Sequence, residues 1–302
     1  MRIIRNPENH GPRVVALGTF DGVHLGHQEL IRQGKTLAET LGAKLRVCVF
    51  DRHPMEVLCP EKAPSMLTTA DEQAECMRQL GVDELRVFPF TRETADMPPE
   101  AFLASLREEC GLLCIVAGWN YTFGRKGLGN EETLRADAEL HGTRALIVPP
   151  VRTGAGEIIS STEVREKLLR GDVEGAREML GMPYEISGTV ADGKHMGSKI
   201  GCPTANIRTA PRKLMPAYGV YACRTRCGDE EWNAVVNIGL QPTLPSGEVT
   251  VETHILGANP ALYGKRATVR LMRYLRPERK FDSVEALREQ IREDERRALA
   301  VL

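Results

Sequence analysis

No sign of charge predominates in this sequence of 302 residues, because 40 basic and 41 acidic side chains leave a formal net charge of -1. A protein that holds nucleic acid carries an excess of positive charge, and so does one steered to an anionic membrane surface. We therefore expect neither nucleic acid nor membrane as a partner, and expect small molecules instead. The sequence does not indicate whether the chain forms an oligomer.

Long apolar runs are missing as well. No segment approaches the roughly 20 apolar residues that cross a bilayer, and the N-terminal MRIIRNPENHGPR lacks the apolar stretch of a signal peptide. The eight cysteines form no C-x-x-C pair, and several lie in apolar runs such as VCVF and LLCIVAG, which is typical of reduced core thiols. We therefore expect a cytoplasmic protein that is long enough for two domains.

The first half of the chain alternates short β-rich runs with segments of helical length. The runs are VVALG from residue 14, LRVCVF from 45, LRVF from 85, CIVAG from 114 and ALIV from 145, and helices are expected over 26–40, 71–80, 99–109 and 131–141. This order predicts a Rossmann-like parallel sheet with helices on its faces over residues 1–158. Ligands of such sheets bind beyond the carboxyl ends of the strands.

The pattern changes after residue 158. Residues 159–183 predict a connector of two short helices, with Ser160 and Glu163 spaced as a capping box. Over residues 184–302 the apolar residues form strand-like runs, which are YEISGTV, GVYACRT, WNAVVNIG, VTVETHIL and RATVRLMRYL. These runs predict a mainly antiparallel β-barrel or a sandwich.

A helix is predicted to end the second domain. It begins at about Ser283, where Asp282 and Glu285 can cap its first turn. The spacing of its apolar residues predicts one buried face, made of Val284, Leu287, Ile291 and Ala298.

The segment GTFDGVHLGHQ, from Gly18 to Gln28, connects the first predicted strand to the first helix. Backbone N–H groups at a helix start attract phosphate. His24 and His27 would face the same way there and can donate hydrogen bonds to a triphosphate, while Gly18 and Gly22 let the backbone approach a ligand closely. Two helix-capping histidines or a metal-binding pair are the alternatives, but the combination favours phosphate handling.

A second segment with candidate functional residues begins at residue 188, with the sequence GTVADGKHMGSKIGCPTAN. Its glycines suit a mobile loop that closes over phosphates, and equally a plain flexible connection. Lys194, His195 and Lys199 could supply positive charge. Thr204 and Asn206 are two residues apart, so they share a face in an extended segment, and their oxygen atoms are ligands that Mg²⁺ prefers.

The HLGH of residues 24–27 matches the H-x-G-H signature of the nucleotidyltransferase superfamily, and GTFDGVHLGHQ as a whole resembles bacterial FAD synthetase. Further segments resemble the same family in order: RHPMEVL from residue 52, GWNYTFGRKGLGN from 118 and ISSTEVREKLLRGDVEGAREMLGMPY from 159. The resemblance continues with GTVADGKHMGSKIGCPTANI from 188 and LYGKRATVRLMRYLRPERKFDSVEALREQIREDERRA from 262. Nearly the whole chain is therefore similar to the bifunctional riboflavin kinase and FAD synthetase family.

The resemblance implies an N-terminal nucleotidyltransferase domain with a defined ATP site. In the family the H-x-G-H histidines contact the ATP phosphates, which makes His24 and His27 the expected catalytic residues. A polar residue near the phosphates corresponds to Asn120, and the ISSTEVR segment places Ser161 and Arg165 beside the nucleotide. The implied ATP-binding set is Gly18, Phe20, Asp21, Gly22, His24, His27, Asn120, Ser161 and Arg165.

The resemblance also implies a riboflavin kinase domain. Thr204 and Asn206 correspond to residues that bind the metal and the nucleotide, and Glu252 to the acid that acts as catalytic base. Spacing alone favours a solvent-facing glutamate at this position, which projects opposite to Val251 and Thr253. The implied ATP- and Mg²⁺-binding set is Gly193, Lys194, Lys199, Gly201, Thr204 and Asn206.

Some positions in the second half depart from the family pattern. Gln241 stands where arginine is usual, Gly257-Ala258 replaces a common Asp-Phe, and Met182 stands where arginine is frequent. The change at Gln241 removes a fixed positive charge and a bidentate hydrogen-bond donor, so we expect weaker kinase activity or flavin affinity.

Two reactions are implied. Riboflavin and ATP give FMN and ADP in the C-terminal domain, and FMN and ATP give FAD and pyrophosphate in the N-terminal domain. ATP is the co-substrate, Mg²⁺ the cofactor, and riboflavin, FMN and FAD are substrates or products. The alternatives are an FAD synthetase whose kinase domain is weakened or inactive, and a flavin or nucleotide sensor without turnover.

Overall fold

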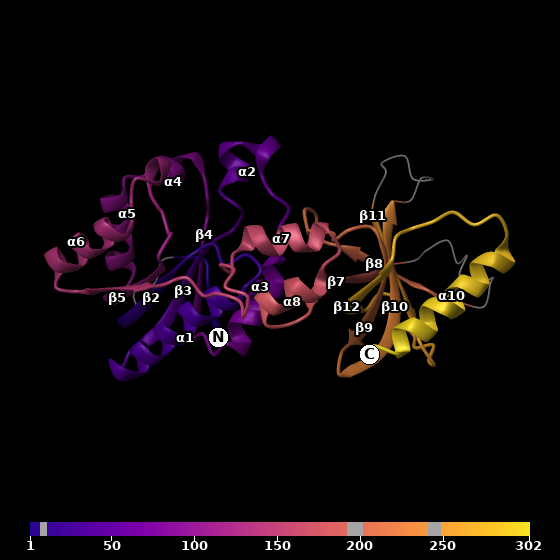
Figure 1. Cartoon of the computed structure of the whole chain (residues 1–302). Coiled ribbons are helices and arrows are strands. Elements are labelled where there is room, and N and C mark those ends of the chain that lie inside the picture. The colour runs from indigo at the N-terminus through magenta and orange to yellow at the C-terminus, as the bar shows by residue number, and fades with distance from the viewer. Residues whose placement is uncertain (7–10, 192–201, 241–248) are drawn as a thin grey trace. The chain divides into compact units, whose positions relative to one another are not determined.

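The computed structural model of the chain describes residues 1–6, 11–191, 202–240 and 249–302. The chain forms two compact units, Met1–Ser161 and Thr162–Leu302. Their helices and strands carry the labels of Figure 1. Within the described residues, no helix combines the length and the apolar character that crossing a membrane requires.

The first unit is built on a parallel sheet with the strand order β1-β4-β3-β2-β5-β6. The apolar runs predict β2 to β6 correctly. They do not predict β1, because three residues are too few to show a repeating pattern. The strands are β1 (Arg2–Ile4), β2 (Pro12–Leu17), β3 (Lys44–Phe50), β4 (Glu84–Phe88), β5 (Gly111–Gly118) and β6 (Arg144–Val148).

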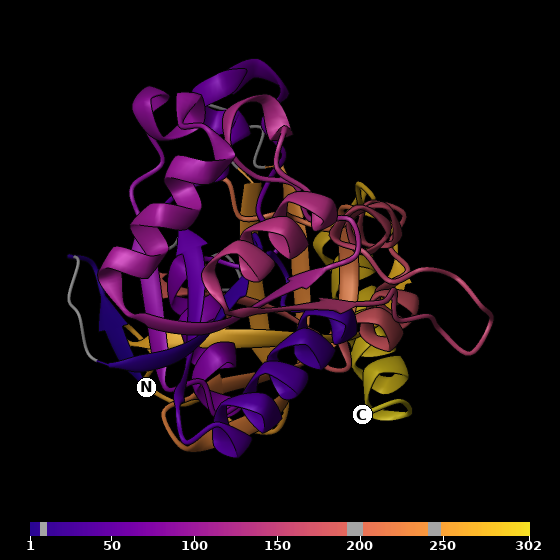
Figure 2. The ribbon, with the colours of Figure 1, turned by 90° about the vertical axis from the view of Figure 1, so that its left-hand side faces the viewer.

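Helices cover both faces of this sheet, which confirms the predicted α/β fold. α1 (Leu25–Thr40) and α3 (Ala70–Gln79) enclose one apolar core, and α5 (Pro99–Glu109) and α6 (Glu131–His141) enclose the other. Figures 1 and 2 show the two helical layers on either side of the strands. The shorter helical segments are α2 (Met55–Leu58), η1 (Pro60–Lys62), α4 (Arg92–Asp96) and η2 (Arg125–Gly127).

The strand order determines where a ligand can approach the sheet. β2 pairs with β3 on one side and with β5 on the other, and Leu17 and Ala117 are register partners at the carboxyl ends of β2 and β5. The segments that start at Gly18 and Gly118 therefore leave the sheet next to each other. Such a reversal of strand order is the place where doubly wound sheets bind their ligands.

The opposite end of the sheet contains a cluster of buried charges. Glu84 accepts hydrogen bonds from Arg13 Nη2 at 2.7 Å and from Arg46 Nε at 2.9 Å, and Glu109 pairs with Arg86 at 2.6 Å. Burial, the largest single influence, raises the pKa of Glu84, but the two arginines together outweigh it and hold this pKa at about 2. The cluster is internally paired, so it stabilises the architecture and does not form a ligand site.

The second unit contains a closed antiparallel barrel with the strand order β10-β11-β8-β7-β12-β9. Of the two predicted architectures, barrel and sandwich, the barrel is therefore the one that forms. The strand-like runs do not predict β8, which directly follows a stretch rich in glycine. The strands are β7 (Tyr184–Ala191), β8 (Ala205–Thr209), β9 (Gly219–Cys227), β10 (Glu230–Leu240), β11 (Val249–Ile255) and β12 (Arg266–Arg276).

The two helices of the predicted connector are α7 (Ser161–Leu169) and α8 (Val173–Leu180). α8 packs against β7 and β12, and Glu174 of α8 accepts a hydrogen bond from Arg273 Nε at 2.8 Å. The carbonyl of Leu168, near the end of α7, accepts a hydrogen bond from Ala217 N at 2.9 Å. Both helices thus contribute contacts to the barrel unit.

The last helix, α10 (Val284–Leu299), forms as predicted but differs in its details. Its N-cap is Ser283, whose hydroxyl accepts a hydrogen bond from Ala286 N at 3.1 Å, so the expectation of a cap at Asp282 is wrong. The expected apolar face also begins too early, since Val284 is exposed while Ala298 is fully buried. α10 packs on β9 and β10 and lies against the barrel in Figure 1.

Candidate active sites

The turn that follows β2 has an unusual backbone. Phe20 and Val23 both adopt positive φ angles, of 51° and 42°, and Gly22 between them has a φ of 80°. Left-handed backbone is costly for a residue with a side chain, of order 1–3 kcal/mol, and most costly for a β-branched residue such as valine. Strain of this kind persists where the surrounding structure enforces it, and it gathers at functional sites.

Two side chains hold this strained turn in place. The carboxylate of Asp21, which is almost fully buried, accepts hydrogen bonds from Leu67 N at 3.2 Å and Thr68 N at 3.1 Å. Gln73 of α3 donates from Nε2 to the carbonyls of Thr19 and Phe20. The observed contacts of Asp21 are therefore those of an anchor for the turn, and the ATP contact expected for it remains a prediction.

The turn leads directly into the two histidines. His24 is the N-cap of α1, and its Nδ1 accepts a hydrogen bond from His27 N at 3.3 Å. In a neutral imidazole this leaves the proton on Nε2, where it can be donated to a ligand. The rings of His24 and His27 stack with centroids 3.7 Å apart, so the two histidines do face the same way.

His27 lies in an unusual environment for a histidine. Burial, and secondarily the neighbouring His24, lowers the pKa of His27 well below its usual value. Its Nδ1 is buried without a hydrogen-bond partner, and a polar ligand would satisfy such an atom. The first turn of α1 contains no acidic residue, so nothing there opposes the attraction of the helix N-terminus for phosphate.

Two of the three glycines in this segment, Gly18 and Gly26, make room for aromatic rings. A Cβ on Gly26 would lie 3.1 Å from Cε1 and Nδ1 of the His24 ring, and a Cβ on Gly18 would lie 3.0 Å from the ring of Phe20. The sequence suggests that Gly18 serves close approach to a ligand. The structure adds a second cause, because Phe20 is fully buried and packs 5.1 Å from the ring of His27.

Other residues predicted for this site come from different segments. Asn120 is exposed in the turn after β5, beside the segment that follows β2. Ser161, the first residue of α7, donates from its hydroxyl to the carbonyl of Asp21 at 2.9 Å. Arg165 lies one turn further along α7. The structure therefore joins Ser161 to the loop that contains the histidines, and it places Asn120 just after the end of the neighbouring strand β5.

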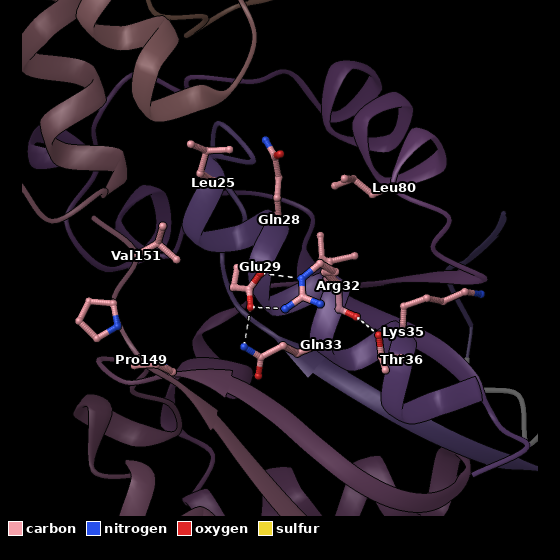
Figure 3. A pocket seen from close by; sticks show the side chains of 12 residues that line it. Leu25, Gln28, Glu29, Arg32, Gln33, Lys35, Thr36, Leu80, Pro149 and Val151 are labelled. Atoms are coloured by element: carbon pink, nitrogen blue, oxygen red, sulfur yellow. Dashed lines mark hydrogen bonds and ion pairs between the residues drawn. The ribbon is translucent and has the colours of Figure 1, made fainter. Parts of the chain in front are cut away.

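A groove of about 670 Å³ begins beside the histidines, at Leu25 and Gln28. Figure 3 shows one wall formed by α1 and the opposite wall by the segment after β6, which contains Pro149 and Val151. Glu29, which lines the groove, accepts hydrogen bonds from Arg32 and Gln33, and these two contacts lower its pKa to about 2. Pattern reasoning does not find this groove, because its walls are far apart in the sequence.

The second site lies on the outer face of the barrel. Glu252 of β11 is the register partner of Asn206 on β8 and of Asn237 on β10. Register partners in antiparallel strands have Cβ atoms about 4.5–5.5 Å apart. The flanking Val251 and Thr253 are buried, so Glu252 projects to the opposite face, as its place in the alternating pattern predicts.

The structure adds two residues to this site that the sequence analysis does not name. Asn237 donates from Nδ2 to the Glu278 carboxylate at 3.3 Å, and Glu278 occupies the space that a side chain at Gly239 would take. Asn237 could have been found by the same alternation that places Glu252. Glu278 could not, because the segment between β12 and α10 has no periodicity.

The described residues include only part of the set predicted for the barrel site. Thr204 is described and immediately precedes β8. Asn206 of the same set lies within β8. The remaining four residues of the expected ATP- and Mg²⁺-binding set, Gly193, Lys194, Lys199 and Gly201, lie outside the described residues. His195 and the unusual Gln241 lie outside them as well.

Two family models match the chain, FAD synthetase over residues 6–163 and riboflavin kinase over residues 180–302. The chain belongs to the bifunctional riboflavin kinase/FMN adenylyltransferase family. A family member from Listeria monocytogenes is 38% identical over 94% of this chain and 90% of its own length, and one from Bacillus subtilis is 35% identical over 97% and 93%. The family predicted from the motifs is thus confirmed.

A solved structure from Streptococcus pneumoniae has the same fold, with a TM-score of 0.85. It is 32% identical to this chain and covers 97% of it and 94% of its own length. That protein is named a macrolide-efflux protein, whereas the Listeria and Bacillus relatives are named for flavin chemistry. The efflux name applies to that protein alone, and the family assignment rests on the family models and the curated relatives.

Proposed function

We propose that the chain phosphorylates riboflavin to FMN in the barrel unit and adenylylates FMN to FAD in the sheet unit. The observation that carries this proposal is the presence of both family domains, each with its reactive side chains in a consistent geometry. His24 and His27 stack at the start of α1, and Glu252 and Asn206 face each other across the barrel strands.

In the adenylylation, a phosphate oxygen of FMN attacks the α-phosphorus of ATP and pyrophosphate leaves. The FMN phosphate is already ionised at neutral pH, so the step needs no general base. The chain must hold the FMN phosphate in line with the α-phosphorus of ATP and the departing pyrophosphate, and it must stabilise the charge that gathers on pyrophosphate. His24 Nε2, His27 and the N-terminus of α1 supply donors for that charge, and Asp21 and Gln73 keep the turn rigid.

In the phosphorylation, the ribityl 5′-hydroxyl of riboflavin attacks the γ-phosphorus of ATP and loses its proton. We infer that Glu252 accepts this proton, which its register partnership with Asn206 and its direction opposite to the buried Val251 and Thr253 support. Asn237 on the other side of Glu252 is oriented by its hydrogen bond to Glu278.

Magnesium fits the oxygen-bearing residues at the barrel site. The Thr204 hydroxyl and the Asn206 amide oxygen are hard donors of the kind that Mg²⁺ takes together with substrate phosphates. When bound, Mg²⁺ would neutralise phosphate charge. Thr204 precedes β8 and Asn206 lies within it, opposite Glu252. We propose that these two residues hold the ion.

We further propose that small molecules are the only partners these reactions require, and that the enzyme works in the cytoplasm. The eight cysteines support this location, because all of them are free thiols, as expected in a reducing compartment.

A product assay distinguishes this function from its main alternative, an FAD synthetase with an inactive kinase unit. The protein is incubated with riboflavin, ATP and Mg²⁺, and the flavins are separated by chromatography. We expect FMN and then FAD. If FAD forms from supplied FMN but FMN never forms from riboflavin, the kinase half of the proposal is wrong, and binding without any product indicates a sensor.

Single substitutions should separate the two reactions. His27→Ala should lower the rate of FAD formation by about 10²-fold or more, because a donor to the developing pyrophosphate charge is lost, and should spare FMN formation. Glu252→Ala should do the reverse through loss of the base. His141→Ala on α6 and Glu230→Ala on β10, both exposed, are matched controls that should change neither rate. Loss of both activities from one active-site change would contradict two separate sites.

A further inference from the structure

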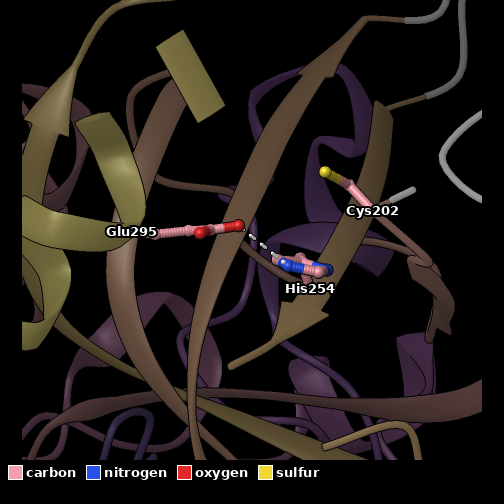
Figure 4. Close-up of side chains that lie close together, drawn as sticks. All are labelled: Cys202, His254 and Glu295. Carbon is pink, nitrogen blue, oxygen red and sulfur yellow. Dashed lines mark hydrogen bonds and ion pairs between the residues drawn. The ribbon is translucent and has the colours of Figure 1, made fainter. Parts of the chain in front are cut away.

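Three side chains outside the residues used above converge on one point of the barrel unit. They are Cys202, which precedes β8, His254 of β11 and Glu295 of α10, and all three are half-buried. One candidate ligand atom from each lies within 4.8 Å of the other two. Figure 4 shows the three side chains approaching from three separate segments.

The hydrogen bonds of His254 limit how its ring can be protonated. Nδ1 lies 2.8 Å from the carbonyl oxygen of Pro203, which can only accept, so Nδ1 carries a proton. Nε2 lies 3.1 Å from the Glu295 carboxylate. The Nε2 lone pair of a neutral His254 would therefore point at the negatively charged Glu295 carboxylate, and the two would repel. A positive charge between Nε2 and the carboxylate oxygen removes this repulsion, either as a second proton on the ring or as a bound cation.

The position of Cys202 favours a cation. An imidazolium–carboxylate pair needs no third group, whereas a thiol beside histidine and carboxylate completes a ligand set typical of zinc. The hydrogen bond from Nδ1 to a backbone carbonyl is also the arrangement that usually orients a metal-bound histidine. Metal binding would release the thiol proton of Cys202 to solvent.

We propose that Cys202 Sγ, His254 Nε2 and the Glu295 carboxylate form a binding site for Zn²⁺, with water as the fourth ligand. Tetrahedral zinc with bonds of about 2.0–2.3 Å requires ligand atoms roughly 3.3–3.8 Å apart. The observed limit of 4.8 Å is close enough for small side-chain rotations to complete the site.

The site differs in chemistry from the proposed Mg²⁺ site. A thiolate and an imidazole are soft ligands that select zinc over magnesium, whereas Thr204 and Asn206 offer hard oxygen atoms. The three zinc ligands also come from three segments of the unit. A bound ion would therefore tie α10 to β11 and to the chain that enters β8.

Cobalt titration of the full-length protein tests the proposal directly. The reduced protein is freed of metal with a chelator and titrated with Co²⁺ alone. We expect a thiolate-to-cobalt charge-transfer band in the near ultraviolet that saturates at one ion per chain. Added Zn²⁺ should displace the Co²⁺ and remove the band. Cys202→Ser should abolish the band. Cys227→Ser, at a half-buried cysteine at the end of β9, should retain it. His254→Gln and Glu295→Gln should each weaken Zn²⁺ binding at least about tenfold.

Thermal unfolding provides a second measurement. Zn²⁺ should raise the melting temperature of the wild-type protein and of Cys227→Ser but not of Cys202→Ser, because an ion stabilises only the folded state that binds it. The proposal is overturned if no cobalt band forms, or if the band persists in Cys202→Ser. A melting temperature that falls in His254→Gln but never responds to Zn²⁺ would instead identify a simple imidazolium–carboxylate pair.

Discussion

At the scale of single residues, the start of α1 shows how a glycine can position a histidine. The His24 ring lies over the first turn of α1, in the space beside Gly26. The glycine of H-x-G-H therefore has a geometric cause. The residue directly before the second histidine must leave room for the first ring to accept a hydrogen bond from the backbone N–H of the second. A sequence pattern reveals the two histidines, but it does not reveal this packing.

Gly26→Ala should therefore impair catalysis although alanine normally favours a helix. The added Cβ would press on the His24 ring, displace it by a few tenths of an ångström and weaken the cap on His27 N. We expect FAD formation from FMN to fall about tenfold or more, with FMN formation from riboflavin unchanged. Steady-state rates of both reactions measure this. Thr40→Ala, an exposed change at the end of the same helix, is the control, and an equal loss in both variants would refute the packing explanation.

The lowered pKa of His27 predicts that ATP binding is coupled to a proton. Burial keeps His27 neutral in the free protein, and a triphosphate beside the ring would raise its pKa again. At about pH 6 we expect binding to take up a proton, which calorimetry in buffers of different ionisation enthalpy detects. The uptake should vanish in His27→Gln and remain in His141→Gln. Proton uptake that is unchanged in His27→Gln would assign it to another group.

The same residue influences stability without ligand. Its folded pKa lies below its unfolded value of about 6.5, so the unfolded chain binds a proton that the folded chain resists. Stability of the ligand-free sheet unit should therefore decline as the pH falls below about 6.5.

The placement of residues was predictable where a short segment contains all the partners. Local spacing puts His24 and His27 together at the start of α1, and alternation gives the direction of Glu252, whereas the role of Glu252 as a base rests on the family resemblance. The anchoring contacts of Asp21 with Leu67 and Thr68, by contrast, join residues more than 40 positions apart in the chain. Such contacts depend on tertiary structure, and one sequence contains no signal for them.

At the scale of elements, the parallel sheet combines an apolar interior with ion pairs at one end. Arg13, Arg46 and Arg86 sit on neighbouring strands and are almost fully buried. An unpaired buried charge is very costly, so these residues and their acidic partners depend on one another. The sequence predicts the strands from their apolar residues, but the charged residues within them give no indication of their burial.

Glu84→Gln should destabilise the sheet unit by about 3–5 kcal/mol, because it leaves Arg13 and Arg46 without their shared carboxylate. Urea unfolding monitored by circular dichroism measures the change. Glu75→Gln, which removes an exposed ion pair with Arg78 on α3, should cost less than about 1 kcal/mol. Similar losses in both variants would contradict a special role for burial.

The pH dependence of this cluster has a defined direction. The folded pKa of Glu84 is about 2, below the ordinary 4.5, so its contribution is complete above pH 4.5 and is lost as the pH falls toward 2. In Glu84→Gln the free energy of unfolding should therefore depend less on pH below 4.5 than it does in the wild type. A dependence as steep as that of the wild type would show that other carboxylates control acid unfolding.

At the scale of the whole molecule, the border between the two units passes through the segment that the sequence assigns to a connector. Ser161 hydrogen-bonds to the turn of the first unit, while α7 continues into the second. α8, with Val173, Ala176 and Met179 fully buried, packs on the barrel. The sequence shows that the residue pattern changes at this segment, but it does not show that α8 packs on β7 and β12.

Fragments of the chain test this border. We expect residues 159–302 to fold and to phosphorylate riboflavin, whereas residues 184–302 should be much less stable, since each buried aliphatic side chain of α8 contributes about 1.5–3 kcal/mol. Melting temperatures and FMN formation compare the two fragments.

Residues 1–158 should form FAD poorly even when folded, because this fragment lacks both Arg165 and Ser161. Ser161 supports the turn through its hydrogen bond to the carbonyl of Asp21. Full FAD synthesis by this fragment would show that α7 is dispensable for adenylylation, and equal stability of the two barrel fragments would show that α8 is a linker only.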